Sequence, residues 1–166
     1  MQPSTHFAAG LFFGLAVVTY FGQSYWWALA AAFIAMFVDI DHGIAYFLHY
    51  HKFSIKGCFN ACCGHMFPGG RMFIHHKNGF LAITTTLIVM YVVNPFIAVL
   101  IGVAYYSHYI LDHRIFNPHI KGFDDYTIHT RPFGYLYDLS WREVLIELAL
   151  WIGSAWFLLP KLWEII

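Results

Sequence analysis

The sequence predicts an all-α protein, an integral membrane bundle of about five helices in up-and-down order. Composition is the first reason, because 60% of the 166 residues are hydrophobic and only 11% are charged, whereas soluble domains carry about a quarter charged residues. The second reason is that the hydrophobic residues form long segments separated by turns or polar loops. A chain of this length is typical of one domain, so residues 1–166 are expected to form a single membrane domain.

The expected helices cover about residues 6–21, 24–42, 73–93, 95–112 and 143–163, with loops at 43–72 and 113–142. A helix needs roughly 20 residues to cross a bilayer, and these segments approach that length. Short links at residues 22–24 and at Asn94-Pro95 join two of the pairs, so the helices of each pair should be antiparallel neighbours. Gly10, Gly14 and the alanines between residues 28 and 35 should let the first two helices pack closely.

Four short polar clusters interrupt the hydrophobic segments at their ends. They contain His6; Asp39, Asp41 and His42; His75 and His76; and Ser107, His108 and Asp112. Because successive helices reverse direction, all four clusters should meet at the same end of the bundle. Most Lys and Arg residues lie in the two loops at that end, so the positive-inside rule assigns it to the cytoplasm.

The residue types in these clusters favour a metal site. His108 and Asp112 are four residues apart and share one helix face, where an imidazole and a carboxylate can bind one cation. Asp39 and Asp41 follow an apolar segment, and carboxylates at membrane depth are costly unless they are paired or bound to metal. The alternatives are a hydrogen-bonded pair for His108 and Asp112, a solvated helix terminus for the aspartates, and an interfacial side chain for His6.

The order of the clusters resembles the YdjM-like family of inner-membrane-associated, metal-dependent hydrolases. The matching motifs are Thr5-His6, Asp39-Ile40-Asp41-His42, Arg71-Met72-Phe73-Ile74-His75 and Ser107-His108-Tyr109-Ile110-Leu111-Asp112, and the match spans about residues 4–112. The third motif departs most from the family pattern. Met72, Ile74 and His76 replace its glycine, threonine and serine. Gly70 stands where the family often has a histidine. In the second motif, Val38 replaces a proline.

The resemblance implies which residues form the site. The implied metal or catalytic residues are His6, Asp39, Asp41, His42, His75, His108 and Asp112. Among them we predict His6, Asp41, His42, His75, His108 and Asp112 as metal ligands and Asp39 as catalytic, together with Arg71; the secondary candidates are His76, His113 and Arg114. Adjacent helical residues point about 100° apart, and we expect His75 rather than His76 to face inward. Asp39 or Asp41 would act as general base, and Arg71 or Arg114 would hold a phosphate.

These residues predict a hydrolase for a phosphoester or lipid-linked substrate at the cytoplasmic side of a prokaryotic inner membrane. The expected cofactor is a divalent metal, zinc first, with manganese or iron as alternatives. The expected partners are membrane lipids, a lipid-like or phosphorylated substrate and a larger membrane complex, whereas a net charge of zero gives no indication of nucleic-acid binding. Two other functions stay open: a membrane di-iron oxygenase or hydroxylase, and a non-catalytic accessory subunit of a membrane complex.

One loop carries a separate group of metal-ligand residue types. Cys58, Cys62, Cys63 and His65 lie within eight positions of one another. Their spacing does not match a standard pair of CxxC elements, so the alternatives are a structural zinc site and three reduced thiols in a cytoplasmic loop.

Overall fold

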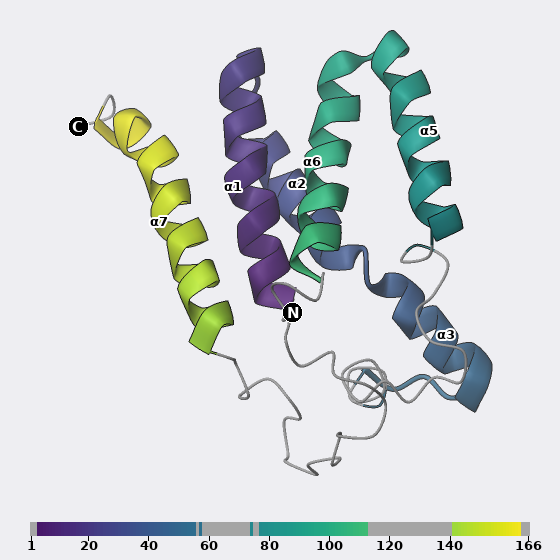
Figure 1. The fold of residues 1–166 in the computed structure, drawn as a ribbon. Coiled ribbons are helices and arrows are strands. Elements are labelled where there is room, and N and C mark those ends of the chain that lie inside the picture. Colours follow the sequence, from purple (N-terminus) through teal and green to yellow (C-terminus); the bar gives the residue numbers. More distant parts are fainter. Residues whose placement is uncertain (1–2, 56, 58–73, 75–76, 113–140, 164–166) are drawn as a thin grey trace.

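The computed structural model describes residues 3–55, 57, 74, 77–112 and 141–163, and the regular structure in these residues is entirely helical (Figure 1). The helices are α1 (Pro3–Phe21), α2 (Trp26–Phe37), α3 (Ile40–Tyr50), α5 (Lys77–Val93), α6 (Pro95–Leu111) and α7 (Trp141–Trp163). The all-α prediction is therefore confirmed. Helix α1 packs against α2, α6 and α7, whereas α5 packs against α6 at the edge of the bundle (Figure 1).

The closest helix contact joins α1 to α2, and it follows from small residues on both faces. A Cβ atom added to Gly10 would lie 2.7 Å from the carbonyl oxygen of Ala31 and 2.7 Å from the Cβ of Ala35. One added to Gly14 would lie 2.9 Å from the Cβ of Ala31. The two backbones therefore touch, as the small residues predicted. His6 lies one turn before Gly10 on the same face of α1, so this contact also fixes the position of His6 relative to α2.

The turn between α5 and α6 shows how the sequence orients the helix that carries His108. The side-chain oxygen of Asn94 accepts a hydrogen bond from the backbone N–H of Ile97 at 3.1 Å, which is a standard N-cap interaction. Pro95 occupies the first helical position, where its missing N–H costs nothing. This turn reverses the chain, and the C-terminal end of α6 returns to the end of the bundle where α1 begins (Figure 1).

The second expected helix differs from the observed structure. Instead of one helix over about residues 24–42, α2 ends at Phe37 and α3 begins at Ile40 and continues into the expected loop. Asp39 lies in the break with φ −75° and ψ 5°, at the N-terminal end of α3. The helix macrodipole favours an acidic residue at a helix N-terminus and disfavours one at a C-terminus, so a break at Asp39 is the better arrangement. The ends of α5 and α7 differ from expectation by a few residues.

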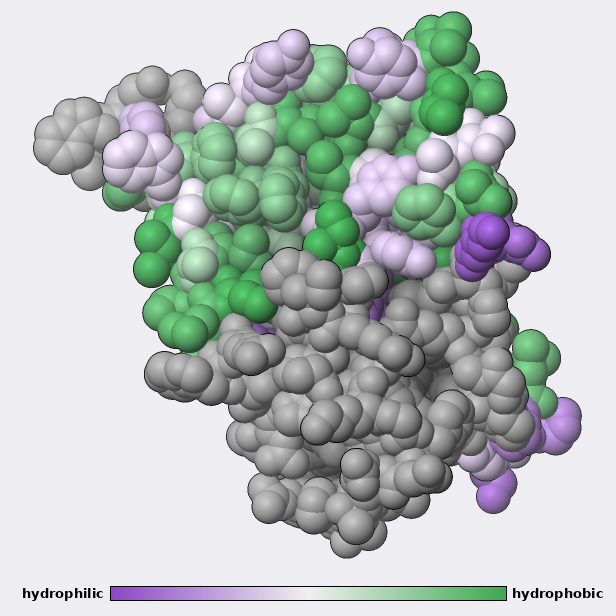
Figure 2. All heavy atoms as spheres, in the orientation of Figure 1, coloured by the Kyte–Doolittle hydropathy of each residue, from purple (hydrophilic) through white to green (hydrophobic). Residues whose placement is uncertain are grey.

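Two of the described helices are long and apolar enough to cross a membrane. They are α1 and the segment Glu143–Pro160 of α7, while α2, α5 and α6 are apolar but shorter. Large hydrophobic side chains such as Trp26, Ile88, Val92 and Trp156 are exposed around the bundle. Figure 2 shows apolar residues over much of the visible bundle surface. By length and composition, α1 and α7 are candidate membrane spans.

Candidate metal centre

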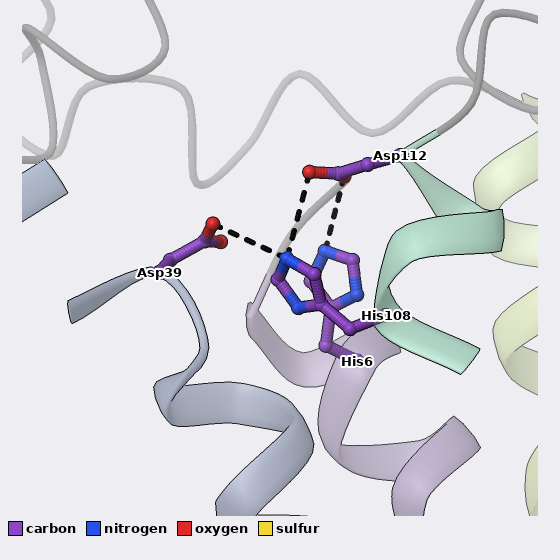
Figure 3. A group of neighbouring side chains, drawn as sticks. All are labelled: His6, Asp39, His108 and Asp112. Carbon is purple, nitrogen blue, oxygen red and sulfur yellow. Dashed lines mark ion pairs between the residues drawn. The ribbon is translucent and has the colours of Figure 1, made fainter. Parts of the chain in front are cut away.

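Four side chains from three parts of the fold converge at one end of the bundle (Figure 3). His6 lies near the start of α1, Asp39 lies between α2 and α3, His108 lies in the last turn of α6, and Asp112 caps the end of α6. One ligand atom from each residue can be chosen so that all four atoms lie within 4.8 Å of one another. We call this group the histidine–aspartate cluster.

The contacts within the cluster join each imidazole to a carboxylate. The Nε2 atom of His6 lies 3.3 Å from an Asp112 oxygen, and the Nε2 atom of His108 lies 3.2 Å from Asp39 and 3.6 Å from Asp112. The two imidazole rings stack with their centroids 3.9 Å apart. Asp112 therefore contacts both histidines, while Asp39 reaches His108 from the opposite side (Figure 3).

A backbone carbonyl fixes how His108 presents its ring nitrogens. Its Nδ1 lies 2.8 Å from the carbonyl oxygen of Ala35. Because a carbonyl can only accept, Nδ1 must carry the proton. In the neutral ring, Nε2 then has a lone pair that faces the carboxylates of Asp39 and Asp112. A lone pair and two anionic groups repel one another unless a cation, either a metal ion or a proton, lies between them.

Because the histidines are buried, polar atoms in this cluster that lack a hydrogen bond or a bound cation would raise the free energy of the folded protein. The side chains of His6 and His108 are fully buried, whereas the side chain of Asp112 is 15% exposed and that of Asp39 is 32% exposed. Neither ring nitrogen of His6 makes a hydrogen bond to the residues that the structure describes, although Nε2 is within ion-pair distance of Asp112. A buried polar atom without a partner costs about 1–3 kcal/mol. Two imidazole nitrogens and two carboxylates are a donor set that fits a divalent transition metal.

The charge state of Asp112 suits a ligand. Burial acts to raise the pKa of its carboxyl, but the effects that act in the other direction prevail, and the close contact with His6 is the largest of them. The pKa of Asp112 consequently lies well below its ordinary value. Asp112 is therefore ionised at neutral pH, as a metal ligand must be.

A second group of polar side chains lies beside the site, and it was not predicted from the sequence. The hydroxyl of Thr5 lies 3.2 Å from a Glu143 oxygen and 3.1 Å from a Glu147 oxygen, and the hydroxyl of Ser4 donates to Glu147 at 3.3 Å. Thr5 and Glu143 are buried. We call this group the threonine–glutamate cluster. A signal was present, because two acidic residues four positions apart in an apolar segment share one helix face and need partners.

The structure gathers only part of the predicted site. It brings together the predicted ligands His6, His108 and Asp112, and it adds Asp39, which was predicted as a catalytic base and stands here among the candidate ligands. Asp41 and His42 lie in the first turn of α3, but their side chains are outside the described residues. The other predicted residues are also outside them and stay predictions: Arg71, His75, His76, His113, Arg114, Cys58, Cys62, Cys63 and His65.

Comparison of the chain with protein-family models, with curated proteins and with solved structures finds no match.

Proposed function

We propose that the chain is a membrane-bound, metal-dependent hydrolase that acts on a phosphoester or lipid-linked substrate at the cytoplasmic face of a prokaryotic inner membrane. The observation that carries this proposal is the convergence of His6, Asp39, His108 and Asp112 at one end of an apolar helical bundle. The order of the short motifs that contain these residues, which resembles a family of membrane-associated metal-dependent hydrolases, supports the same function.

The metal would be held by the two imidazoles and the two carboxylates of the histidine–aspartate cluster. Zinc suits this mixed nitrogen and oxygen donor set, and manganese or iron also fit it. When bound, such a cation supplies Lewis acidity, which activates water and neutralises negative charge on a phosphoryl oxygen. The buried His6 nitrogens, which make no hydrogen bond to the described residues, support a ligand role for His6.

The exposures of the two aspartates suggest different roles. Asp39 has the more exposed carboxylate of the two, so it faces the side from which water and substrate arrive. A metal would use one oxygen of Asp39, and the other oxygen of the carboxylate would be left to accept a proton from water, in keeping with its predicted role as general base. Asp112 contacts both histidines and orients their rings. His108 is held in one tautomer by the carbonyl of Ala35.

The place of the site in the bundle favours a substrate that reaches it from the membrane. The cluster lies where α1 begins and α6 ends, so a bilayer around the apolar helices would put the cluster near one headgroup layer. A lipid-linked phosphate would reach that depth by lateral diffusion. Arg71 and Arg114 are proposed to hold its phosphate, because guanidinium matches phosphate geometry.

The metal content of the purified full-length protein tests this proposal. We expect near-stoichiometric divalent metal in the unaltered protein and a loss of most of it in Asp39→Ala and in His108→Ala. His49→Ala is the matched control, because His49 is exposed on α3 and should leave the metal in place. Full metal content in both cluster variants would contradict the metal site.

A second measurement tests the reaction. The metal-loaded protein in detergent micelles should hydrolyse a generic phosphodiester such as bis(p-nitrophenyl) phosphate, and Asp39→Ala should abolish the activity. Bound iron with a visible absorption band would instead favour the oxygenase. Bound metal without hydrolysis of any phosphoester, together with co-purification in a larger complex, would favour the accessory subunit.

A further inference from the structure

Helix α3 exposes a continuous apolar stripe. Ile40, Ile44, Phe47 and Leu48 are each between 49% and 62% exposed. Their spacing of four, three and one residues places them on one arc of about 100° around the helix. These side chains do not contribute to the core of the bundle, which is built from residues such as Leu15, Leu100 and Ala104.

The opposite side of α3 has a different character. The rings of Tyr46 and Tyr50 are tilted at 41° to each other with their centroids 4.8 Å apart, and His49 meets Tyr50 edge to face at 4.6 Å. At 100° per residue, His49 lies opposite the apolar stripe. The helix ends at Tyr50 and is followed by the C-cap residue His51, whose left-handed backbone (φ 51°) turns the chain, and then by the exposed Lys52. One face of α3 is thus apolar, and the other carries aromatic rings with polar groups.

The stripe continues an exposed apolar surface of the preceding helix. Phe33 and Phe37 of α2 are exposed, and their rings stack at 6.3 Å between centroids. Ile40 follows directly after the break at Asp39. In Figure 1, α3 leaves the site end of α2 and runs obliquely away from the bundle. Exposed apolar side chains therefore lie on both sides of the break at Asp39.

We propose that α3 is an interfacial helix whose apolar stripe binds the acyl region of the membrane next to the metal site. A helix with one apolar face and one polar face is typical of segments that lie in the plane of a bilayer surface. Tyrosine rings favour the headgroup region, and Lys52 attracts anionic lipid. This inference rests on the membrane part of the proposed function and is independent of hydrolysis.

The consequence for the site comes from Asp39. It is the residue immediately before α3, and its carboxylate contacts His108. If the stripe of α3 lies among acyl chains, then the more exposed carboxylate of the cluster lies at the level of the lipid headgroups. A lipid-linked substrate would meet the site without leaving the bilayer.

Collision accessibility of spin labels tests this placement in the full chain, reconstituted in vesicles of phosphatidylethanolamine and phosphatidylglycerol. In a background of Cys58→Ser, Cys62→Ser and Cys63→Ser, single labels are attached through Ile44→Cys, Leu48→Cys or His49→Cys. Ile152→Cys gives a reference position, because Ile152 is exposed in the middle of the candidate span in α7. Each label is scored by its relative collision rates with oxygen, which concentrates in lipid, and with a water-soluble nickel chelate.

The proposal expects labels at 44, 48 and 152 to favour oxygen, with an oxygen-to-nickel ratio several-fold above that of the label at 49. Equal nickel access at 44, 48 and 49, with position 152 still in lipid, would overturn the role of α3 and leave the membrane bundle intact. Labels at 44 and 48 that meet neither reagent would overturn it as well, because the stripe would then be covered by protein. Nickel access at all four positions would overturn the membrane assignment together with the inference.

Discussion

The first turn of α1 lies between two polar clusters that each contain two carboxylates. The clusters differ in whether hydrogen-bond donors are present to compensate the negative charge. On one side, Thr5 and Ser4 offer hydroxyl protons to Glu143 and Glu147. These carboxylates also lie at the N-terminal end of α1, where the helix macrodipole favours negative charge. The threonine–glutamate cluster therefore provides its own donors and polarity.

On the other side, the histidine–aspartate cluster combines carboxylates with imidazole nitrogens. The proton on His108 Nδ1 is used by the carbonyl of Ala35, which leaves a lone pair toward Asp39 and Asp112. Hydroxyl donors complete one cluster, whereas the other needs a cation, either a metal ion or a proton, between its nitrogen lone pair and its carboxylates. Two clusters with the same number of carboxylates therefore differ in whether their own donors can satisfy those carboxylates.

The largest effect should come from removing charge in the histidine–aspartate cluster. Asp112→Asn keeps the shape of the side chain but gives both histidines a neutral neighbour. Because loss of a supporting group alone costs about 10–100-fold in metal affinity, loss of this candidate ligand should cost about 100-fold or more. Competition with a chromophoric chelator measures the dissociation constant. Glu147→Gln, the same change in the other cluster, is the control, and equal losses in both variants would remove the distinction between the clusters.

A smaller effect should follow from separating α1 and α2. In Gly10→Ala the new Cβ would lie 2.7 Å from backbone and side-chain atoms of α2, so the helices must move apart, at a cost of about 1–3 kcal/mol of unfolding free energy. The shift would also move the Ala35 carbonyl from His108, and metal affinity should fall about tenfold.

Gly102→Ala is the matched control for this prediction. Its Cβ would meet the nearest atoms at 3.8 Å or more, which is ordinary van der Waals distance. We expect unchanged metal affinity and unchanged or slightly higher thermal stability of this variant. If Gly10→Ala and Gly102→Ala behave alike in both measurements, the α1–α2 contact does not position the site.

A still smaller effect on the metal is expected from the threonine–glutamate cluster. Thr5→Val keeps the shape of the side chain but leaves buried Glu143 without the Thr5 hydroxyl, which should lower the unfolding free energy by about 1–3 kcal/mol. The first turn of α1 would fray more easily, so metal affinity should fall less than tenfold. Thr5→Ser keeps the hydroxyl and should retain most of the affinity. A full loss of metal in Thr5→Val would mean that the two clusters act as one site.

The smallest effect is the pH dependence of metal binding near neutrality. An imidazole binds metal only when its ring is neutral, so protons compete with the metal and affinity falls as the pH falls. With two histidine ligands, the affinity should fall more steeply as the pH falls than with one, because two protons compete with the metal. Asp112 adds no pH dependence near neutrality, because its pKa is lowered. Titrations from neutral to acidic pH measure the slope, and a profile that stays flat throughout would contradict two histidine ligands.

The helices and the end of the bundle that carries the site were predictable from the sequence. Long apolar segments and tight turns such as Asn94-Pro95 set the helix order, and the order predicted that His6 and His108 would meet. The spacing of His108 and Asp112 predicted a shared face, which the structure contains. The small residues of α1 and α2 likewise predicted their close contact.

The remaining features depend on tertiary contacts. The macrodipole disfavours Asp39 at a helix C-terminus, but this weak local signal does not locate a break, since an apolar run followed by Asp and His also fits one continuous helix end. The Ala35 carbonyl is one of the last in α2, where a carbonyl has no backbone N–H partner within the helix. It accepts a hydrogen bond from the His108 side chain, and this contact makes the break favourable. The hydroxyl donors Ser4 and Thr5 are 138 or more positions away from Glu143 and Glu147 in the chain, and no local pattern specifies such a pairing.

The backbone contact at Gly10 and Gly14 also has a consequence for cation size. It fixes the separation between α1, which carries His6, and the end of α2, where Asp39 follows. Helices in direct backbone contact cannot move closer, and the hydrogen bond between Ala35 and His108 ties the end of α2 to α6. In the metal site proposed above, a fixed separation of this kind would favour ions that form bonds of about 2.0–2.2 Å, such as zinc. It would disfavour calcium, which needs six to eight oxygen ligands at about 2.3–2.6 Å. The glycines of α1 would thereby influence which ion the proposed site prefers.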